Sequence, residues 1–191
     1  MSPVDRGTGP ETLRAAPAEA AAPRADAGAP TAVHPACTVA VVIEREARPN
    51  RWEDWRFRIA EVLPDEGAFG AAPRLLRDDG RVARFLHPGL RVELFRDEGE
   101  GYYLNLSSGA PAWFVVWRAD DEDPGSAWPA TVSVSYNEAG RWLDAQEHVE
   151  QLPMPAEVAA WLQAYTDENY RPEPKKRRRP QSFLPPEERR S

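Results

Sequence analysis

Residues 38–45 read Thr-Val-Ala-Val-Val-Ile-Glu-Arg, a short run of mostly β-branched apolar side chains. Ten residues further on, residues 55–59 read Trp-Arg-Phe-Arg-Ile, in which apolar side chains alternate strictly with arginine. An apolar run of this length and a two-residue alternation are both typical of β-strands and show no helical period. The two stretches therefore predict neighbouring strands and a β-rich fold.

Similar short segments continue for about eighty residues. They predict further strands at residues 81–86, 90–96, 102–107, 113–118 and 131–135. Asp78-Asp79-Gly80 is a hairpin signal and His87-Pro88-Gly89 predicts a second tight turn. Most links are too short for a helical crossover, so neighbouring strands should be antiparallel. We expect a meander of six or seven strands, open or partly closed into a barrel, with no helix between Leu90 and Arg118.

The pattern changes to a helical period after Ser135. Ser135 and Glu138 have the spacing of a capping box, which predicts a helix over residues 136–146. Pro155 suits the first position of a second helix. In that helix one apolar stripe is formed by Val158, Trp161, Leu162 and Tyr165. The predicted class is α+β, with two C-terminal helices packed on the sheet.

Aromatic residues mark the limits of the folded domain. Of 18 aromatic residues, 17 lie between Cys37 and Tyr170 in a chain of 191 residues. Residues 1–36 contain 11 alanines and 6 prolines and have little to bury, so we expect a disordered arm. Residues 171–191 form a basic, proline-rich tail that is also expected to be disordered. A single domain over residues 37–170 remains.

Charge and cysteine content narrow the functional classes. Residues 37–170 hold 13 basic and 24 acidic groups, and an acidic body of this kind repels nucleic-acid backbones. Cys37 is the only cysteine, which excludes an intrachain disulfide or a zinc site built from cysteines. The longest strongly apolar run, residues 39–43, is much shorter than the roughly 20 residues of a membrane-spanning helix. We expect a cytoplasmic protein with no membrane segment.

Catalytic motifs are absent from the sequence. It contains no nucleophile elbow, phosphate-binding loop, dinucleotide fingerprint or HExxH zinc motif. The three histidines, His34, His87 and His148, fall in the arm, in a predicted turn and between the two helices, without ligand spacing. The sequence therefore favours a binding protein over an enzyme and predicts no cofactor.

Two features are candidates for partner binding. The strand at residues 113–118 is apolar on both faces, so either the fold covers both sides or one side is an aromatic groove for a partner. The groove and its rim would include Arg51, Trp52, Trp55, Tyr103 and Asn105. The second feature is the basic run Lys175, Lys176, Arg177, Arg178 and Arg179. This run fits an inert solubilising tail, a contact with an acidic protein or phosphorylated cofactor, or a nucleic-acid contact.

An ordered series of short motifs also resembles a known family, the uncharacterised proteobacterial proteins of domain of unknown function 3305. The matching stretches are Val41-Val42-Ile43-Glu44-Arg45, Asn50-Arg51-Trp52, Tyr102-Tyr103-Leu104-Asn105-Leu106, Trp113-Phe114-Val115-Val116-Trp117-Arg118, Ser135-Tyr136-Asn137-Glu138-Ala139, Pro153-Met154-Pro155 and Tyr170-Arg171-Pro172-Glu173-Pro174-Lys175-Lys176. The resemblance covers residues 37–179.

What the resemblance implies is a functional context. Genes of this family commonly lie near those for molybdenum-dependent formate dehydrogenase, which implies an accessory role in the maturation or regulation of that enzyme. The expected partner is a formate dehydrogenase subunit or a maturation factor. The alternative is an enzyme or carrier in molybdopterin-guanine dinucleotide biosynthesis. The nucleotidyltransferase family of that pathway opens with a glycine-rich GTP-binding loop after its first strand, whereas here Ile43 is followed by Glu44-Arg45-Glu46-Ala47-Arg48.

Overall fold

Two antiparallel sheets form the centre of the protein, whose structure is a computed structural model that describes residues 34–48 and 54–172. The four strands of the first sheet, sheet A, lie in the order β2-β1-β4-β3. Their bounds are β1 (Ala36–Ala47), β2 (Trp55–Pro64), β3 (Arg74–Asp78) and β4 (Val82–Glu93). The second sheet, sheet B, has the order β6-β5-β7. It consists of β5 (Ala112–Ala119), β6 (Ala127–Ser133) and β7 (His148–Pro153).

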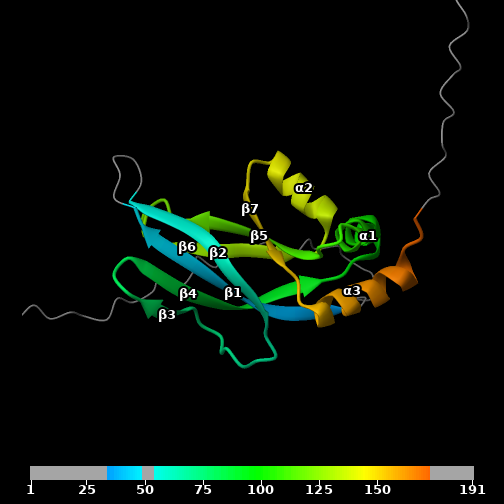
Figure 1. Ribbon diagram of the computed structural model, residues 1–191, viewed down its shortest axis with the longest axis horizontal. Helices are drawn as coiled ribbons and strands as arrows, with labels where there is room; N and C mark the ends of the chain where they lie inside the picture. Colours follow the sequence, from blue (N-terminus) through cyan, green and yellow to red (C-terminus); the bar gives the residue numbers. More distant parts are fainter. Residues whose placement is uncertain (1–33, 49–53, 173–191) are drawn as a thin grey trace, which may run out of the picture.

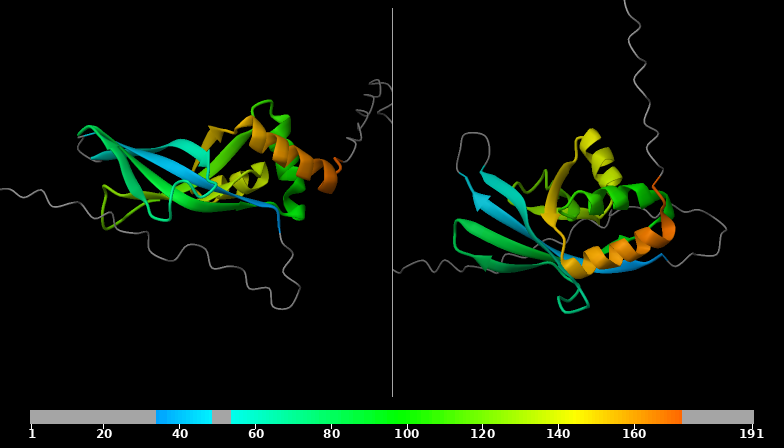
Figure 2. Two further views of the ribbon diagram at one scale, coloured as in Figure 1. Left: turned by 90° about the horizontal axis from the view of Figure 1, so that it is seen from below. Right: turned by 45° about the vertical axis from the view of Figure 1, so that its right-hand side comes forward.

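Three α-helices gather at one end of the two sheets (Figures 1 and 2). They are α1 (Gly99–Ser107), α2 (Tyr136–Asp144) and α3 (Ala156–Asn169), and a short 3-10 helix, η1 (Arg96–Glu98), precedes α1. The sequence prediction of an α+β protein with antiparallel strands and C-terminal helices is confirmed. Val158 and Leu162 of the predicted stripe are buried in the main core, with Trp161 and Tyr165 packed against it.

The main core lies between the sheets and under the helices. Sheet A contributes one face of β1, which carries Val39, Val41 and Ile43, and sheet B contributes Trp113 and Val115. The face of sheet A that carries Val39, Val41 and Ile43 is called its inner face. The opposite, outer face carries Ala40, Val42 and Leu86, which form a second small cluster with Phe69. On sheet B, Phe114 turns away from the main core and its ring meets that of Tyr136 edge-on at 6.2 Å. Helix and sheet thus cover both faces of β5.

The prediction of a strand at residues 102–107 is wrong, because these residues belong to α1. Tyr102 and Asn105 lie on one buried side of this helix, while Tyr103 and Leu104 face solvent. A short apolar run cannot distinguish a helix from a strand by its period alone. Here the packing of Tyr102 and Asn105 at a three-residue spacing outweighs the strand preference of the aromatic pair.

The tight turn expected at His87-Pro88-Gly89 is also wrong. These residues lie within β4, where a β-bulge shifts the pairing so that Val41 faces His87 and Val39 faces Leu90. Gly89 has a φ of 82°, a left-handed conformation that glycine adopts easily. The bulge also accommodates Pro88, which has no N–H to donate to a neighbouring strand. The turn-forming residues therefore bend a long strand instead of ending it.

The expected single meander is replaced by two sheets, and in the described ranges neither closes into a barrel. The two predicted hairpins β1–β2 and β3–β4 exist, and Gly80 at the Asp78-Asp79-Gly80 turn donates its N–H to Asp78 Oδ1. Between them, however, residues 65–73 carry the chain from one edge of sheet A to the other. The sequence does not predict β7, because its six residues include a proline and just two other apolar side chains, Val149 and Leu152.

His87 is buried, although the sequence placed it in an exposed turn. Burial lowers the pKa of His87 from 6.5 to about 4, and its Nε2 has no hydrogen-bond partner. The unfolded chain therefore binds a proton that the folded protein excludes, and stability should fall as the pH drops from 6.5 to 4. The expected loss is about 3 kcal/mol relative to a His87→Phe variant. Urea unfolding at pH 7 and pH 4 measures it, and equal losses in both proteins would contradict the assignment.

Candidate functional site

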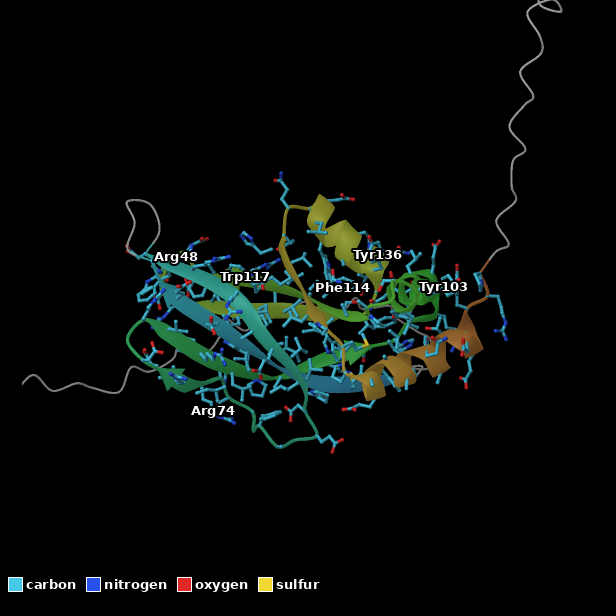
Figure 3. The ribbon with its side chains drawn as sticks, in the orientation of Figure 1. Arg48, Arg74, Tyr103, Phe114, Trp117 and Tyr136 are labelled. Carbon is cyan, nitrogen blue, oxygen red and sulfur yellow. The ribbon has the colours of Figure 1, made fainter. Side chains whose placement is uncertain are left out.

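The described residues among those that the sequence predicts for a groove, Trp55, Tyr103 and Asn105, do not all come together. Trp55 begins β2 at the hairpin end of sheet A, whereas Tyr103 lies on α1 at the helical end (Figures 1 and 3). Arg51 and Trp52 lie outside the described residues, as do the basic residues Lys175, Lys176, Arg177, Arg178 and Arg179.

Trp55 is part of a cation–π cluster that joins the two sheets. The Arg45 guanidinium lies 4.4 Å above the Trp55 ring and 5.2 Å from the Phe85 ring. Arg45 Nη1 also donates a hydrogen bond of 2.8 Å to the carbonyl oxygen of Gly125, in the loop between β5 and β6. Arg45 therefore fixes one face of the Trp55 ring, and Trp55 has a structural role here.

Tyr103 and Asn105 differ sharply in their surroundings. The Tyr103 ring is partly exposed and lies 5.7 Å from the ring of Tyr170. Asn105 is 1% exposed, and its side-chain amide binds three backbone groups. Nδ2 donates to the carbonyl oxygens of Ala112 and Val134, and Oδ1 accepts from the N–H of Ala112. Asn105 thus ties α1 to sheet B from within the core and presents no group to a partner.

Among the described residues, a concentrated charged surface lies elsewhere, on the outer face of sheet A. Directly opposed residues of an antiparallel pair share a face. The register places Arg58 and Arg84 on either side of Glu44, Arg56 opposite Glu46, Arg77 opposite Arg84 and Arg74 opposite Leu86. We call the six arginines of this surface the arginine face: Arg56, Arg58, Arg74, Arg77, Arg81 and Arg84.

Glu44 organises the centre of the arginine face. Its side chain is 8% exposed and accepts hydrogen bonds of 2.8 Å from Nε of Arg58 and from Nε of Arg84. Burial opposes the charge of Glu44, but the two guanidinium groups outweigh it and hold its pKa below the usual value. Glu44 therefore stays ionised and orients an arginine on each neighbouring strand.

The remaining arginines of the face are exposed, and Nη1 of Arg74 donates a hydrogen bond to the carbonyl oxygen of Phe69. Arg77 and Arg81 are exposed and make single ion pairs with Asp79 and Glu46 respectively. Figure 3 shows Arg74 beside β3 at the edge of the sheet, far from Tyr103. Six of the 13 basic residues between positions 37 and 170 thus share one surface with the four carboxylates of Glu44, Glu46, Glu61 and Asp79, in a domain that is acidic as a whole. Such a surface attracts anionic groups.

Sequence reasoning could find only part of this surface. The alternation of Arg56 and Arg58 with apolar residues predicts one polar face of β2. Arg74, Arg77 and Arg84 join that face because the chain crosses sheet A before β3. The crossing lets β4 pair with β1, with β3 outside it. No local pattern specifies that crossing.

A second polar cluster lies where α1 meets α2, and it supports the fold. Ser135 caps α2 by accepting from the N–H of Glu138, as the capping box predicts, and its hydroxyl donates to Glu98. The Ser133 hydroxyl donates to Glu138, and burial raises the pKa of the Glu138 carboxyl. Both serine hydroxyls are thus committed to carboxylates. This arrangement fixes the start of α2, and both serines are buried.

Residues 34–48 and 54–172 contain no group of three or more His, Cys, Asp or Glu side chains placed to hold a metal ion. No helix in these ranges is long and apolar enough to cross a membrane. One open hollow, of about 680 Å³, lies between the residues just before β1, η1 and the end of α3. His34, Phe95, Arg96 and Tyr165 are among its lining residues. Its lining mixes both charges and indicates no particular ligand.

Comparison with known proteins identifies the family. A family profile described as "Protein of unknown function (DUF3305)" matches residues 38–179, which is most of the chain. The protein belongs to this family. No curated protein and no solved structure shows significant similarity to the chain.

Proposed function

We propose that this protein is a non-catalytic accessory protein that binds an acidic surface of a protein partner through its arginine face. The observation that carries the proposal is the gathering of six arginines on one sheet face of an acidic domain. Paired strands fix the backbone that carries these side chains, so little backbone freedom is lost when a partner binds. A complementary charge on the partner would speed association and fix its orientation.

The partner that the family context suggests is a subunit of molybdenum-dependent formate dehydrogenase or a factor that matures it. The role would be to assist maturation or regulation in the cytoplasm. The alternative, an enzyme or carrier in molybdopterin-guanine dinucleotide biosynthesis, draws on the same arginines. Guanidinium groups bind phosphate with two parallel hydrogen bonds, so the face could hold a phosphorylated cofactor.

Co-purification with a charge-matched control tests the proposal. In a bacterium that makes formate dehydrogenase, the tagged full-length protein should recover an enzyme subunit or a maturation factor. The Arg56→Gln/Arg77→Gln variant lacks two positive charges of the arginine face and should bind that purified partner about tenfold more weakly. The measurement is made at low ionic strength, because salt screens such contacts in the unchanged protein as well. The control, Arg96→Gln/Arg118→Gln, removes the same charge from other exposed positions and should bind normally.

Three outcomes would contradict the proposal. Recovery of no formate dehydrogenase component excludes the suggested partner. Equal binding by the two double variants excludes the arginine face. Tight binding of GTP or of the pterin cofactor to the purified protein, measured by calorimetry, would favour the cofactor carrier instead.

A further inference from the structure

β3 leaves one side of its backbone free at the edge of sheet A. It pairs with β4 on one side, and no described strand pairs with the other. At the opposite edge of the sheet a backbone group of β2 has a partner from sheet B. Glu150 of β7 accepts a hydrogen bond of 2.9 Å from the N–H of Ile59. All five residues of β3 are exposed. The free backbone groups of an edge strand are a place where a strand from another chain can be added.

The side chains of β3 divide into an apolar and a basic side. Leu75 and Leu76 are 46% and 49% exposed, which is unusual for two adjacent leucines on an edge strand. Leu75 lies opposite Phe85 and so points to the inner side of the sheet, whereas Arg74 and Arg77 point to the outer side.

The basic side of β3 depends on a β-bulge. Residues three positions apart normally point to opposite sides of a strand. The pairing of β3 with β4 shifts between Leu75 and Arg77, so Leu76 is an extra residue and both arginines join the arginine face. The edge therefore offers a row of backbone groups between two positive charges on one side and an apolar side chain on the other.

We propose that β3 accepts an extended segment of the protein partner as a fifth strand of sheet A, in which acidic and apolar residues alternate. The acidic side chains of this segment lie over Arg74 and Arg77, and its apolar side chains cover Leu75. The alternation follows from the two-residue period of a strand. This inference rests on the proposed function, because it specifies how a partner is held at the arginine face.

The same charges argue against two other occupants. A second copy of this chain pairing through its own β3 would bring Arg74 and Arg77 of both copies together on one sheet face, and like charges across a strand pair are destabilising. A nucleic acid would gain from the arginines but would leave the leucines uncovered and would meet the acidic remainder of the domain.

Peptide binding to the full-length protein separates these possibilities. The probe is a fluorescent peptide with four Glu-Val repeats, and anisotropy in low salt measures its affinity. Two control peptides contain the same amino acids. The first has the same sequence with N-methyl groups on alternate residues, which removes backbone donors. The second places all glutamates before all valines. We expect the alternating peptide to bind at least about tenfold more tightly than either control. Arg74→Gln/Arg77→Gln should weaken it about tenfold, whereas Arg96→Gln/Arg118→Gln should not.

The outcomes distinguish this inference from the proposed function. If the N-methylated and unmodified peptides bind equally, strand addition is wrong, while a charge contact at the arginine face stands. If no peptide binds but the purified partner still depends on Arg56 and Arg77, strand addition is again wrong and the proposed function stands. If a single-stranded oligonucleotide of equal charge binds more tightly than the peptide, the partner class is wrong. Backbone resonances of β3 that shift with the alternating peptide alone would support the inference.

Discussion

A Gly101→Ala variant is expected to lose about 3 kcal/mol of its free energy of unfolding, because the added methyl group has no room. A Cβ at this position would lie 2.1 Å from Ser135 Oγ and 3.1 Å from the backbone nitrogen of Asn137. Ser135 cannot turn away easily, since its hydroxyl caps α2 and also donates to Glu98. The helices must move apart, and urea unfolding followed by tryptophan fluorescence would measure the loss.

Gly140 provides the matched control for this contact. It lies in α2, and a Cβ built there meets nothing within 4 Å. Gly140→Ala should therefore stabilise the protein by about 0.5 to 1 kcal/mol, since alanine favours the helix more than glycine does. If both alanine variants stabilise the protein, the close approach of α1 to Ser135 is wrong.

Asn105→Ala should have an effect of similar size for a different reason. It leaves the N–H and carbonyl of Ala112 and the carbonyl of Val134 buried without the amide that satisfies them. Each buried group without a partner costs about 1 to 3 kcal/mol, and some relaxation is expected, so the total loss should be about 3 to 4 kcal/mol. The midpoint of urea unfolding reports this loss.

Asn169 is a suitable comparison for Asn105. Its amide donates a single hydrogen bond to the carbonyl oxygen of Tyr165 at the end of α3, where water can replace it. Asn169→Ala should therefore cost less than about 1 kcal/mol. Similar losses in the two variants would show that Asn105 does not hold α1 against sheet B.

The sequence predicts the local elements of this fold better than their arrangement. The apolar run at residues 38–45 and the capping pair Ser135 and Glu138 act through neighbouring residues, and the structure confirms both. Tyr102 and Asn105 are helical because of contacts with β5, with Val134 just after β6 and with Tyr165 of α3, which a local pattern does not contain. His87-Pro88-Gly89 is ambiguous for a related reason, since a bulge and a turn require the same residues.

The candidate site shows the same limit more strongly. Glu44, Arg58 and Arg84 are separated by 14 and 26 positions in the sequence, and only strand register brings them together. Arg74 and Arg77 share one side of the sheet edge only because of a bulge. Asn105, in contrast, was selected as a partner-binding residue from its position beside Tyr103, and the structure places it in the interior.

The order of the two sheets along the chain has a consequence for biosynthesis. The last strand of sheet A ends at Glu93, and the first strand of sheet B begins at Ala112. A ribosome therefore completes sheet A before it makes the first residue of the layer that covers Val39, Val41 and Ile43. Sheet A consists of two hairpins joined through β1 and β4, so its strands can pair early, but its apolar inner face stays uncovered until β5, β6 and α3 emerge. The nascent chain thus exposes an apolar sheet surface from the completion of β4, about halfway along the chain, until α3 has been made.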